Sequence, residues 1–172
     1  VMARVYWSKV NPRAVMPTKR EEDAGFDIYG LLPASYLILK PHQIYSFATG
    51  LKSAFSKRFC FIIKERGSTG TKGIQQRCGV IDSGFRGEWF IPIQNGNDVD
   101  IVFYDDTQIS QSVLMAKLGI MHRDSIYYPM SKAICQAVFT RVPKVKCIEV
   151  DEPTLLKKVS QRMFGMKGSS GK

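Results

Sequence analysis

Short apolar runs alternate with polar turns along most of the chain. The runs are rich in Val, Ile, Phe and Tyr, and Gly, Pro, Asn and Asp gather between them, which is typical of β-strands joined by turns. The strand-like runs are VYWSKV (5–10), YLIL (36–39), QIYSFATGLKSAF (43–55), FCFIIKE (59–65), EWFIPIQN (88–95), DIVFYD (100–105), AICQAVF (133–139) and KCIEVDE (146–152). This pattern predicts an all-β fold, a sandwich or a jelly roll.

One stretch departs from the β pattern. Residues 112–125, SVLMAKLGIMHRDS, have helix-like apolar spacing, but Gly119 interrupts them and no clean cap precedes them. We therefore expect an insertion over about residues 97–130, and the pattern leaves its structure open.

The apolar pattern fades near the carboxyl end. From Leu155 onward few residues could form a core, and after Val159 the chain is nearly all polar or glycine. A chain of 172 residues is long enough for one core without disulfides or metals. We expect one β domain over residues 1–159 and a flexible tail over residues 160–172, without a repeat or a second domain.

Composition narrows the possible surroundings and partners. No apolar run approaches the roughly 20 residues of a membrane span, and no signal-peptide pattern opens the chain, so a soluble, cytoplasmic protein without a membrane partner is expected. The net charge of +10 favours an anionic partner. Because the basic residues are scattered and form no block, charge alone does not lead us to expect nucleic acid.

The cysteines and histidines do not form a metal-binding pattern. The four cysteines include no CxxC pair, and His42 and His122 are far apart in the sequence. A catalytic metal held by protein ligands is therefore not expected. Cys60, Cys135 and Cys147 lie in apolar runs, where we expect buried thiols.

The segment KERGSTGTKG, residues 64–73, has the composition of a phosphate-binding loop. Arg66, Ser68, Thr69 and Lys72 would supply side-chain donors, and the glycines between them leave backbone amides accessible. An ordinary glycine-rich turn before a helix is the alternative interpretation.

The chain stops on a second glycine-rich segment, FGMKGSSGK, residues 164–172. A P-loop has four residues between its first glycine and its Gly-Lys, and a helix follows it. Here five residues separate Gly165 from Gly171, and Lys172 is the last residue of the sequence. The segment is therefore not a P-loop, although its composition suits phosphate.

Three polar residues stand out in apolar surroundings. Asp82 lies in GVIDSGFRG, which has the signature of a β-hairpin with Ser-Gly at the turn. Asp27 lies between glycines in AGFDIYG, and Gln136 is the polar residue of AICQAVF. Taken singly, Asp82 could cap the turn and Gln136 could be a hydrogen-bonded strand residue.

In this order the segments resemble the five motifs of the trimeric dUTPase family, deoxyuridine 5'-triphosphate nucleotidohydrolases. AGFDIYG is similar to the first motif, ERGSTGTKGI to the second, GVIDSGFRGE to the third, AICQAVF to the fourth and SQRMFGMKGSSGK to the fifth. The resemblance implies a jelly-roll homotrimer with three sites at subunit interfaces, each assembled from all three chains. The tail would close over the triphosphate in a neighbour's site.

The resemblance also implies a role for each matching residue. Asp82 would deprotonate the water that attacks the α-phosphorus of dUTP, giving dUMP and pyrophosphate. Asp27 and Gln136 would support catalysis, and Mg2+ would be held by the substrate phosphates and water. The implied substrate-binding residues are Arg66, Gly67, Ser68, Thr69, Arg162, Lys167, Gly168, Ser169 and Ser170 around the phosphates, and Gly79, Val80, Ile81 and Phe85 around the nucleoside.

The chain departs from the family pattern at three positions. The usual Arg-Ser-Gly of the second motif is Arg66-Gly67-Ser68, the hairpin tyrosine is Phe85, and the tail phenylalanine that covers uracil is Lys167. Phe85 keeps the flat ring that packs on deoxyribose. Either Phe164 replaces the tail ring, or Lys167 binds phosphate instead.

Two other functions fit parts of the pattern. dCTP deaminase shares the implied fold, but Pro92 occupies the position of its catalytic glutamate, and proline cannot transfer a proton. A dUTPase-like regulatory protein could instead bind a protein through the insertion, or nucleic acid through its basic surface.

Overall fold

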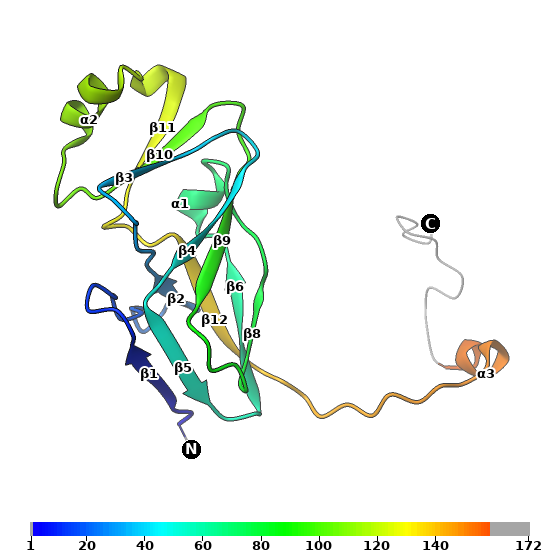
Figure 1. Ribbon diagram of the computed structural model, residues 1–172. Helices are drawn as coiled ribbons and strands as arrows, with labels where there is room; N and C mark the ends of the chain where they lie inside the picture. Colours follow the sequence, from blue (N-terminus) through cyan, green and yellow to red (C-terminus); the bar gives the residue numbers. More distant parts are fainter. Residues whose placement is uncertain (1, 159–172) are drawn as a thin grey trace. The chain divides into compact units, whose positions relative to one another are not determined.

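Most of the apolar runs form strands in the computed structural model, which describes residues 2–158. The chain divides into two units, Val1–Val142 and Pro143–Lys172, and the strands belong to the first. They are β1 (Val5–Lys9), β2 (Gly25–Ile28), β3 (Tyr36–Leu39), β4 (Ile44–Ala48), β5 (Leu51–Phe55), β6 (Phe59–Lys64), β7 (Ile74–Gln76), β8 (Val80–Asp82), β9 (Phe90–Asn95), β10 (Asp100–Tyr104), β11 (Ser125–Pro129) and β12 (Cys135–Arg141) (Figure 1). The predicted all-β fold class is confirmed.

The strands pair into four sheets that join distant parts of the chain. The orders are β2-β12-β6-β8, β11-β10-β3, β4-β9-β7 and β1-β5. The predicted run 43–55 is divided into β4 and β5 at Gly50, whose φ of 68° lies in the left-handed region. A side chain there would also come within 2.8 Å of Asn11, so glycine is required for both reasons.

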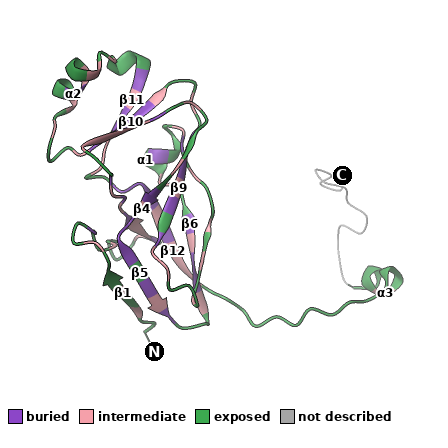
Figure 2. Ribbon diagram, in the orientation of Figure 1, coloured by how far each residue is buried: buried purple, intermediate pink, exposed green. Residues whose placement is uncertain are grey.

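Aromatic side chains dominate the core of the first unit. Trp89, Phe47, Phe61 and Phe103 are fully buried, and Trp7 packs edge-on against Trp89 with ring centroids 4.9 Å apart. The indole Nε1 of Trp89 donates to Ser53 Oγ at 3.0 Å, which satisfies its one buried donor. β5 alternates between buried Leu51, Ser53 and Phe55 and the more accessible Lys52 and Ala54, and Figure 2 colours most of the strand as buried.

The expected insertion contains a helix and two parallel strands. β10 and β11 pair in parallel, and helix α2 (Gln111–Leu118) with the 3-10 helix η1 (His122–Asp124) connects them. The expectation that α2 has no clean cap is wrong. Ser110 Oγ accepts from Val113 N at 3.3 Å, and Gly119, with φ 66°, ends the helix rather than interrupting it. Leu114 anchors α2 in a small separate core with Val102, Tyr104 and Tyr127.

Two other local predictions are also wrong. Residues 82–85 do form a turn, in which Phe85 N donates to Asp82 O at 3.1 Å. However, β8 pairs with β6 and not with a strand that follows the turn. GVIDSGFRG is therefore a strand and a turn rather than a hairpin. The run 146–152 forms no strand, and Cys147 is exposed, whereas Cys60 and Cys135 are buried as expected.

The described part of the second unit contains one short helix. Residues 143–151 have no regular secondary structure, and α3 (Glu152–Leu156) follows, with Asp151 Oδ1 accepting from Thr154 N at 2.9 Å as its cap. The predicted boundary between residues 159 and 160 lies outside the described residues and stays a prediction.

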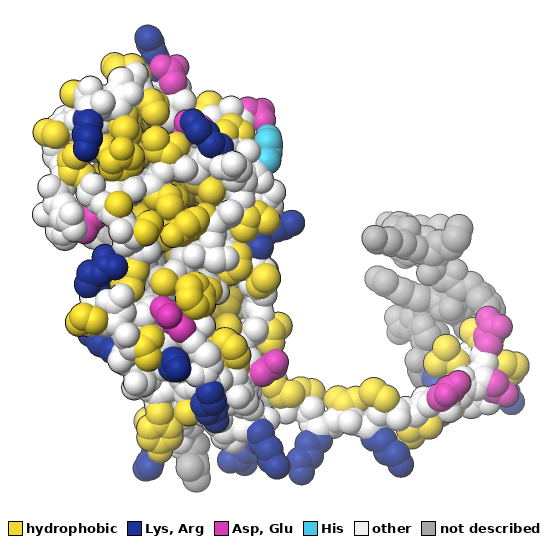
Figure 3. Space-filling view, viewed as in Figure 1, with side chains coloured by type: hydrophobic (Ala, Val, Ile, Leu, Met, Phe, Trp, Pro, Cys, Tyr) yellow, Lys and Arg dark blue, Asp and Glu magenta, His cyan; other side chains and the backbone are white. Residues whose placement is uncertain are grey.

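The first unit carries charges of both signs on its surface. In the face that Figure 3 shows, Lys and Arg side chains are spread from end to end of the first unit, and Asp and Glu side chains lie among them. Within residues 2–158, no helix combines the length and the apolar character needed to span a membrane.

Candidate active site

The neighbouring strands β2 and β12 bring two of the predicted catalytic residues together. Asp27 on β2 lies directly opposite Gln136 on β12, and Gln136 lies opposite Lys64 on β6. Paired residues in an antiparallel sheet point to the same face, so Asp27 and Gln136 share one surface. Gly25 leaves room for the amide, since a Cβ there would lie 2.7 Å from Gln136 Oε1.

Arg66 is the centre of the polar contacts at this surface. Its Nε donates to Asp27 Oδ1 at 2.8 Å and its Nη2 to Asp27 Oδ2 at 3.4 Å, a two-point pair that fixes the guanidinium plane. Its Nη1 donates to Ala133 O at 3.2 Å and to Ser68 Oγ at 3.4 Å. Most of its donors are therefore already bonded within the chain.

A short helical turn presents Arg66 and Ser68. Arg66 is the N-cap of α1 (Gly67–Gly70), and the buried Thr69 holds this cap by accepting from Arg66 N at 3.0 Å and donating to Arg66 O at 3.1 Å. Thr69 thus stabilises the turn, whereas Gly67 and Ser68 face the adjoining cavity.

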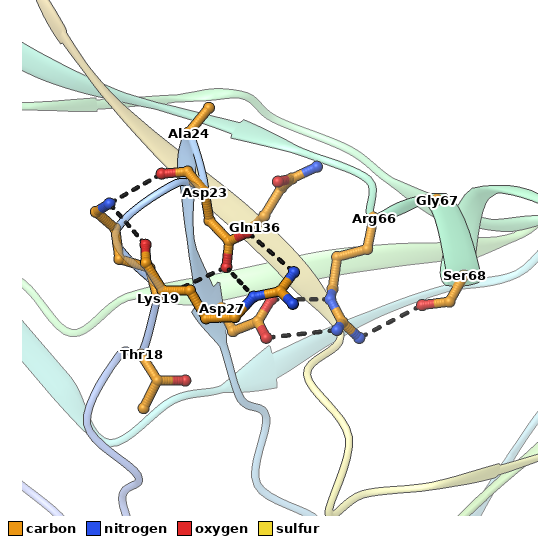
Figure 4. Close-up of a pocket in the computed structure, with 11 residues that line it drawn as sticks. Thr18, Lys19, Asp23, Ala24, Asp27, Arg66, Gly67, Ser68 and Gln136 are labelled. Carbon is orange, nitrogen blue, oxygen red and sulfur yellow. Dashed lines mark hydrogen bonds and ion pairs between the residues drawn. The ribbon is translucent and has the colours of Figure 1, made fainter.

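Asp27, Arg66 and Gln136, with Gly67 and Ser68, line a first cavity of about 600 Å3. Its lining residues are Thr18, Lys19, Arg20, Asp23, Ala24, Gly25, Asp27, Arg66, Gly67, Ser68 and Gln136. Figure 4 shows Lys19 and Asp23 on one side, Arg66 and Ser68 on the other, and Asp27 and Gln136 between them. The arrangement combines positive donors with a backbone turn, which suits a polyphosphate.

Glu65 connects this cavity to a second one. Its carbonyl accepts from Gln136 Nε2 at 2.8 Å, and its carboxylate accepts from Gln76 N at 3.1 Å. The second cavity, of about 360 Å3, is lined by Ile62, Ile63, Lys64, Glu65, Gln76, Arg77, Cys78, Gly79 and Val80. Gly79 and Val80, from the third motif, therefore lie at a different site from Asp27 and Arg66.

The third-motif residues Asp82 and Phe85 are exposed and line neither cavity. The Phe85 ring lies over Gly87, because a Cβ at Gly87 would come within 2.6 Å of it. Ile81 points toward the core, where it packs among the buried residues.

The register of the four-stranded sheet separates Asp82 from the first cavity. Asp27 and Asp82 are three strands apart, and Asp82 pairs with Cys60, four residues along β6 from the row that contains Asp27. These offsets correspond to about 14 Å across the sheet and about 13 Å along it, hence about 19 Å between the two backbones. A side chain cannot cover that distance, so one chain does not assemble Asp82 with Arg66.

The buried Tyr128 shares a hydrogen-bond acceptor with Arg66. Tyr128 Oη donates to Ala133 O at 2.5 Å, the same carbonyl that accepts from Arg66. Burial raises the pKa of Tyr128, and burial, reinforced by Asp27, raises the pKa of Cys135. Both groups therefore stay protonated at neutral pH and act as neutral support.

The sequence analysis missed three charged residues of the cavity, Lys19, Arg20 and Asp23. The charged run KREED, residues 19–23, was the available signal, but two basic residues followed by three acidic ones also suit a solvent-exposed loop. The predicted tail contacts Arg162, Lys167, Gly168, Ser169 and Ser170 lie outside the described residues. Among residues 2–158, no group of three or more His, Cys, Asp or Glu side chains could hold a metal ion.

Comparison with known proteins gives a consistent set of relatives. The dUTPase family model matches residues 11–123. A deoxyuridine 5'-triphosphate nucleotidohydrolase of Leptospira interrogans is 32% identical over 115 residues, which are 64% of this chain and 79% of the relative.

Solved structures show the same fold. A dUTPase variant of Staphylococcus bacteriophage 80alpha with dUpNHpp matches with a TM-score of 0.67 and 21% identity, over 98% of each chain. A dUTPase variant of phage phi11 of S. aureus, described with a structural Mg(II) ion, matches with a TM-score of 0.63 and 19% identity, over 87% of this chain and 97% of the other.

Proposed function

Because the chain belongs to the dUTPase family, we propose that it hydrolyses dUTP to dUMP and pyrophosphate as a homotrimer, with Asp82 as the general base. The observation that carries the proposal is the division of the predicted residues between two places. Asp27, Arg66, Ser68 and Gln136 share one cavity, and Asp82 lies about 19 Å away on the same sheet. A complete site then requires Asp82 from another copy of the chain.

The first cavity holds the triphosphate in this proposal. The remaining N–H of Arg66 and the Ser68 hydroxyl donate to phosphate oxygens, and Asp27 keeps the guanidinium of Arg66 in one plane. Gln136, anchored through Nε2 on Glu65 O, fixes the strand edge beside the α-phosphate. Developing negative charge in the transition state is stabilised by donors that are already oriented.

Asp82 of a neighbouring subunit activates the water. Its carboxylate accepts a proton as the water oxygen bonds to the α-phosphorus, and the bond from that phosphorus to the bridging oxygen breaks. The electron pair leaves with pyrophosphate. Exposure of Asp82 at the end of β8 makes the carboxylate accessible to a second subunit.

Mg2+ fits this cavity as a partner of the substrate. The cavity contains two carboxylates, Asp23 and Asp27, and each is paired with an arginine. The donor set suits an ion held by phosphate oxygens and water, and these carboxylates would accept hydrogen bonds from its waters. When bound, the ion would neutralise phosphate charge.

The second cavity is the proposed uracil site. Gly79 and Val80 line it with backbone groups, and Gly79 O is already used by Ile63 N at 2.7 Å, which fixes the strand that reads the base. Phe85, with its ring over Gly87, packs against deoxyribose and crowds out a 2'-hydroxyl. Arg162, Lys167, Gly168, Ser169 and Ser170 from the tail complete the phosphate contacts.

The substrate is tested by pyrophosphate release from dUTP, dCTP, dTTP and UTP. We expect release from dUTP alone at a substantial rate. Ammonia release from dCTP would instead identify a deaminase, and no turnover of any nucleotide would favour a regulatory protein.

Shared sites are tested by mixing two inactive variants, Asp82→Asn and Arg66→Gln, after joint refolding. In a random one-to-one trimer, about a quarter of the sites combine an intact Arg66 with an intact Asp82 from the next chain. We expect activity near that fraction of wild type, whereas each variant alone is inactive. No recovery would contradict sites built from different chains.

A further inference from the structure

The loop of residues 18–23 forms one wall of the first cavity and lies outside the five motifs. It contributes Lys19, Arg20 and Asp23 to the lining. Figure 4 shows Lys19 and Asp23 opposite Arg66 and Ser68. With Asp27 included, the lining has three cations and two carboxylates, hence a net charge of +1. A bound polyanion can use only those cations whose present partners within the chain can be replaced.

Lys19 is committed to the shape of the loop. Its Nζ donates to the carbonyls of Arg20 at 3.0 Å, Glu21 at 3.3 Å and Asp23 at 2.9 Å. An ammonium has three donors, so all are used within the loop. Lys19 also lies over the Phe26 ring at 5.7 Å, which ties the loop to β2.

Arg20 is held differently. Its Nε and Nη2 donate to the two carboxylate oxygens of Asp23, each at 3.1 Å, and these bonds lower the pKa of Asp23. The Arg20 side chain is 88% exposed, and an exposed pair of this kind contributes little to stability. Asp23 Oδ2 also accepts from Arg20 N at 3.0 Å, so the carboxylate keeps a partner if the guanidinium leaves.

We propose that Arg20 is a substrate-binding residue that exchanges the Asp23 carboxylate for phosphate oxygens when a polyphosphate enters the cavity. The inference rests on the proposed function for the identity of the nucleotide. Arg66 is nearly saturated by Asp27, Ala133 and Ser68, so Arg20 is the cation of this lining whose partner is easily replaced. A polyphosphate carries several charges and competes well against one carboxylate.

Asp23 then acts as an internal competitor. It keeps the guanidinium beside the cavity in the absence of substrate and must release it on binding. Removing Arg20 and removing Asp23 should therefore have opposite effects on affinity. A loop in which the pair is only structural would be weakened in the same direction by both changes.

The test compares Arg20→Gln, Asp23→Asn and the double variant in the full-length protein. Measured quantities are KM and kcat for dUTP, and the Kd of inorganic tripolyphosphate by calorimetry. Arg123→Gln is the matched control, because Arg123 pairs with Asp124, is 82% exposed and does not line the cavity.

We expect Arg20→Gln to raise KM and the tripolyphosphate Kd about five- to tenfold, the size of one charge-assisted contact near solvent, with a smaller effect on kcat. Asp23→Asn should tighten tripolyphosphate binding, and this gain should disappear in the Arg20→Gln background. Arg123→Gln should leave all three quantities unchanged.

Two outcomes would overturn the proposal: an Arg20→Gln variant within twofold of wild type for both ligands, or losses of affinity in both single variants. The tripolyphosphate titration does not require turnover. If the wild-type protein does not hydrolyse dUTP, the proposed function is wrong. The tripolyphosphate titration still decides whether Arg20 binds polyphosphate.

Discussion

Asp82 is the residue on which the proposed chemical step depends. Asp82→Asn keeps the shape of the side chain but cannot accept the proton of the attacking water. We expect dUTP turnover to fall by about a hundred- to ten-thousand-fold, while the Kd of a non-hydrolysable dUTP analogue changes little. Steady-state kinetics and calorimetry measure the two effects. Turnover at the wild-type rate would refute the assignment of Asp82 as base.

Gly25 provides a test of Gln136 without changing that residue. A Cβ at position 25 would lie 2.7 Å from Gln136 Oε1, so Gly25→Ala should push the amide away from Glu65 O. We expect kcat/KM for dUTP to fall to the level of Gln136→Ala, with no further loss in the double variant. Thermal unfolding of all three proteins is the control. Additive losses would show that Gly25 acts independently of Gln136.

The motif residues could be read from the sequence, whereas the charged loop could not. Asp27, Arg66 and Gln136 stand out because each is polar next to glycine or within an apolar strand. In the sequence, Lys19 and Arg20 cannot be told from ordinary solvent-exposed residues. Whether they can contact a ligand depends on which surface of the protein the loop lies against. That placement is set by Lys19 binding three carbonyls, a property of the folded loop.

At the scale of elements, periodicity located the strands of five or more residues except β11, but it did not identify which strands pair. The Ser83-Gly84 signature is the same for a hairpin and for a turn at the end of a strand, and β8 pairs with β6 through contacts distant in sequence. The run 146–152 has apolar alternation like a strand, yet no described strand pairs with it. Alternation of apolar and polar residues shows that a segment suits a half-buried sheet, but the segment becomes a strand only where another strand pairs with it.

The β10–β11 pair should make stability sensitive to alkaline pH. Burial raises the pKa of Tyr104, Tyr127 and Tyr128, so the folded protein keeps protons that the unfolded chain loses. Their contribution to stability is complete below the unfolded phenol pKa of about 10 and is lost as the pH rises above it. Urea unfolding between pH 8 and 11 should show the decline, and Tyr127→Phe should reduce its slope. A slope unchanged in that variant would contradict the assignment.

At the scale of the whole molecule, the tail can be removed without touching the described core. Deleting residues 162–172 removes Arg162 and the two serines of the proposed phosphate contacts. If two charge-assisted donors are lost at roughly 1.5–3 kcal/mol each, turnover should fall at least about a hundredfold. The thermal midpoint should stay the same. Unchanged kinetics after the deletion would rule out a catalytic role for the tail.

If the proposed shared site is correct, the separation of Asp82 from Asp27 within one chain makes catalysis subject to mass action. An enzyme with its whole site in one chain loses activity in simple proportion to dilution. If three copies must meet, the concentration of working sites falls with the third power of the chain concentration once trimers dissociate. Newly synthesised chains would not hydrolyse dUTP until their concentration is high enough for trimers to form. The concentration of the protein would then determine whether there is activity at all, as well as the rate of hydrolysis.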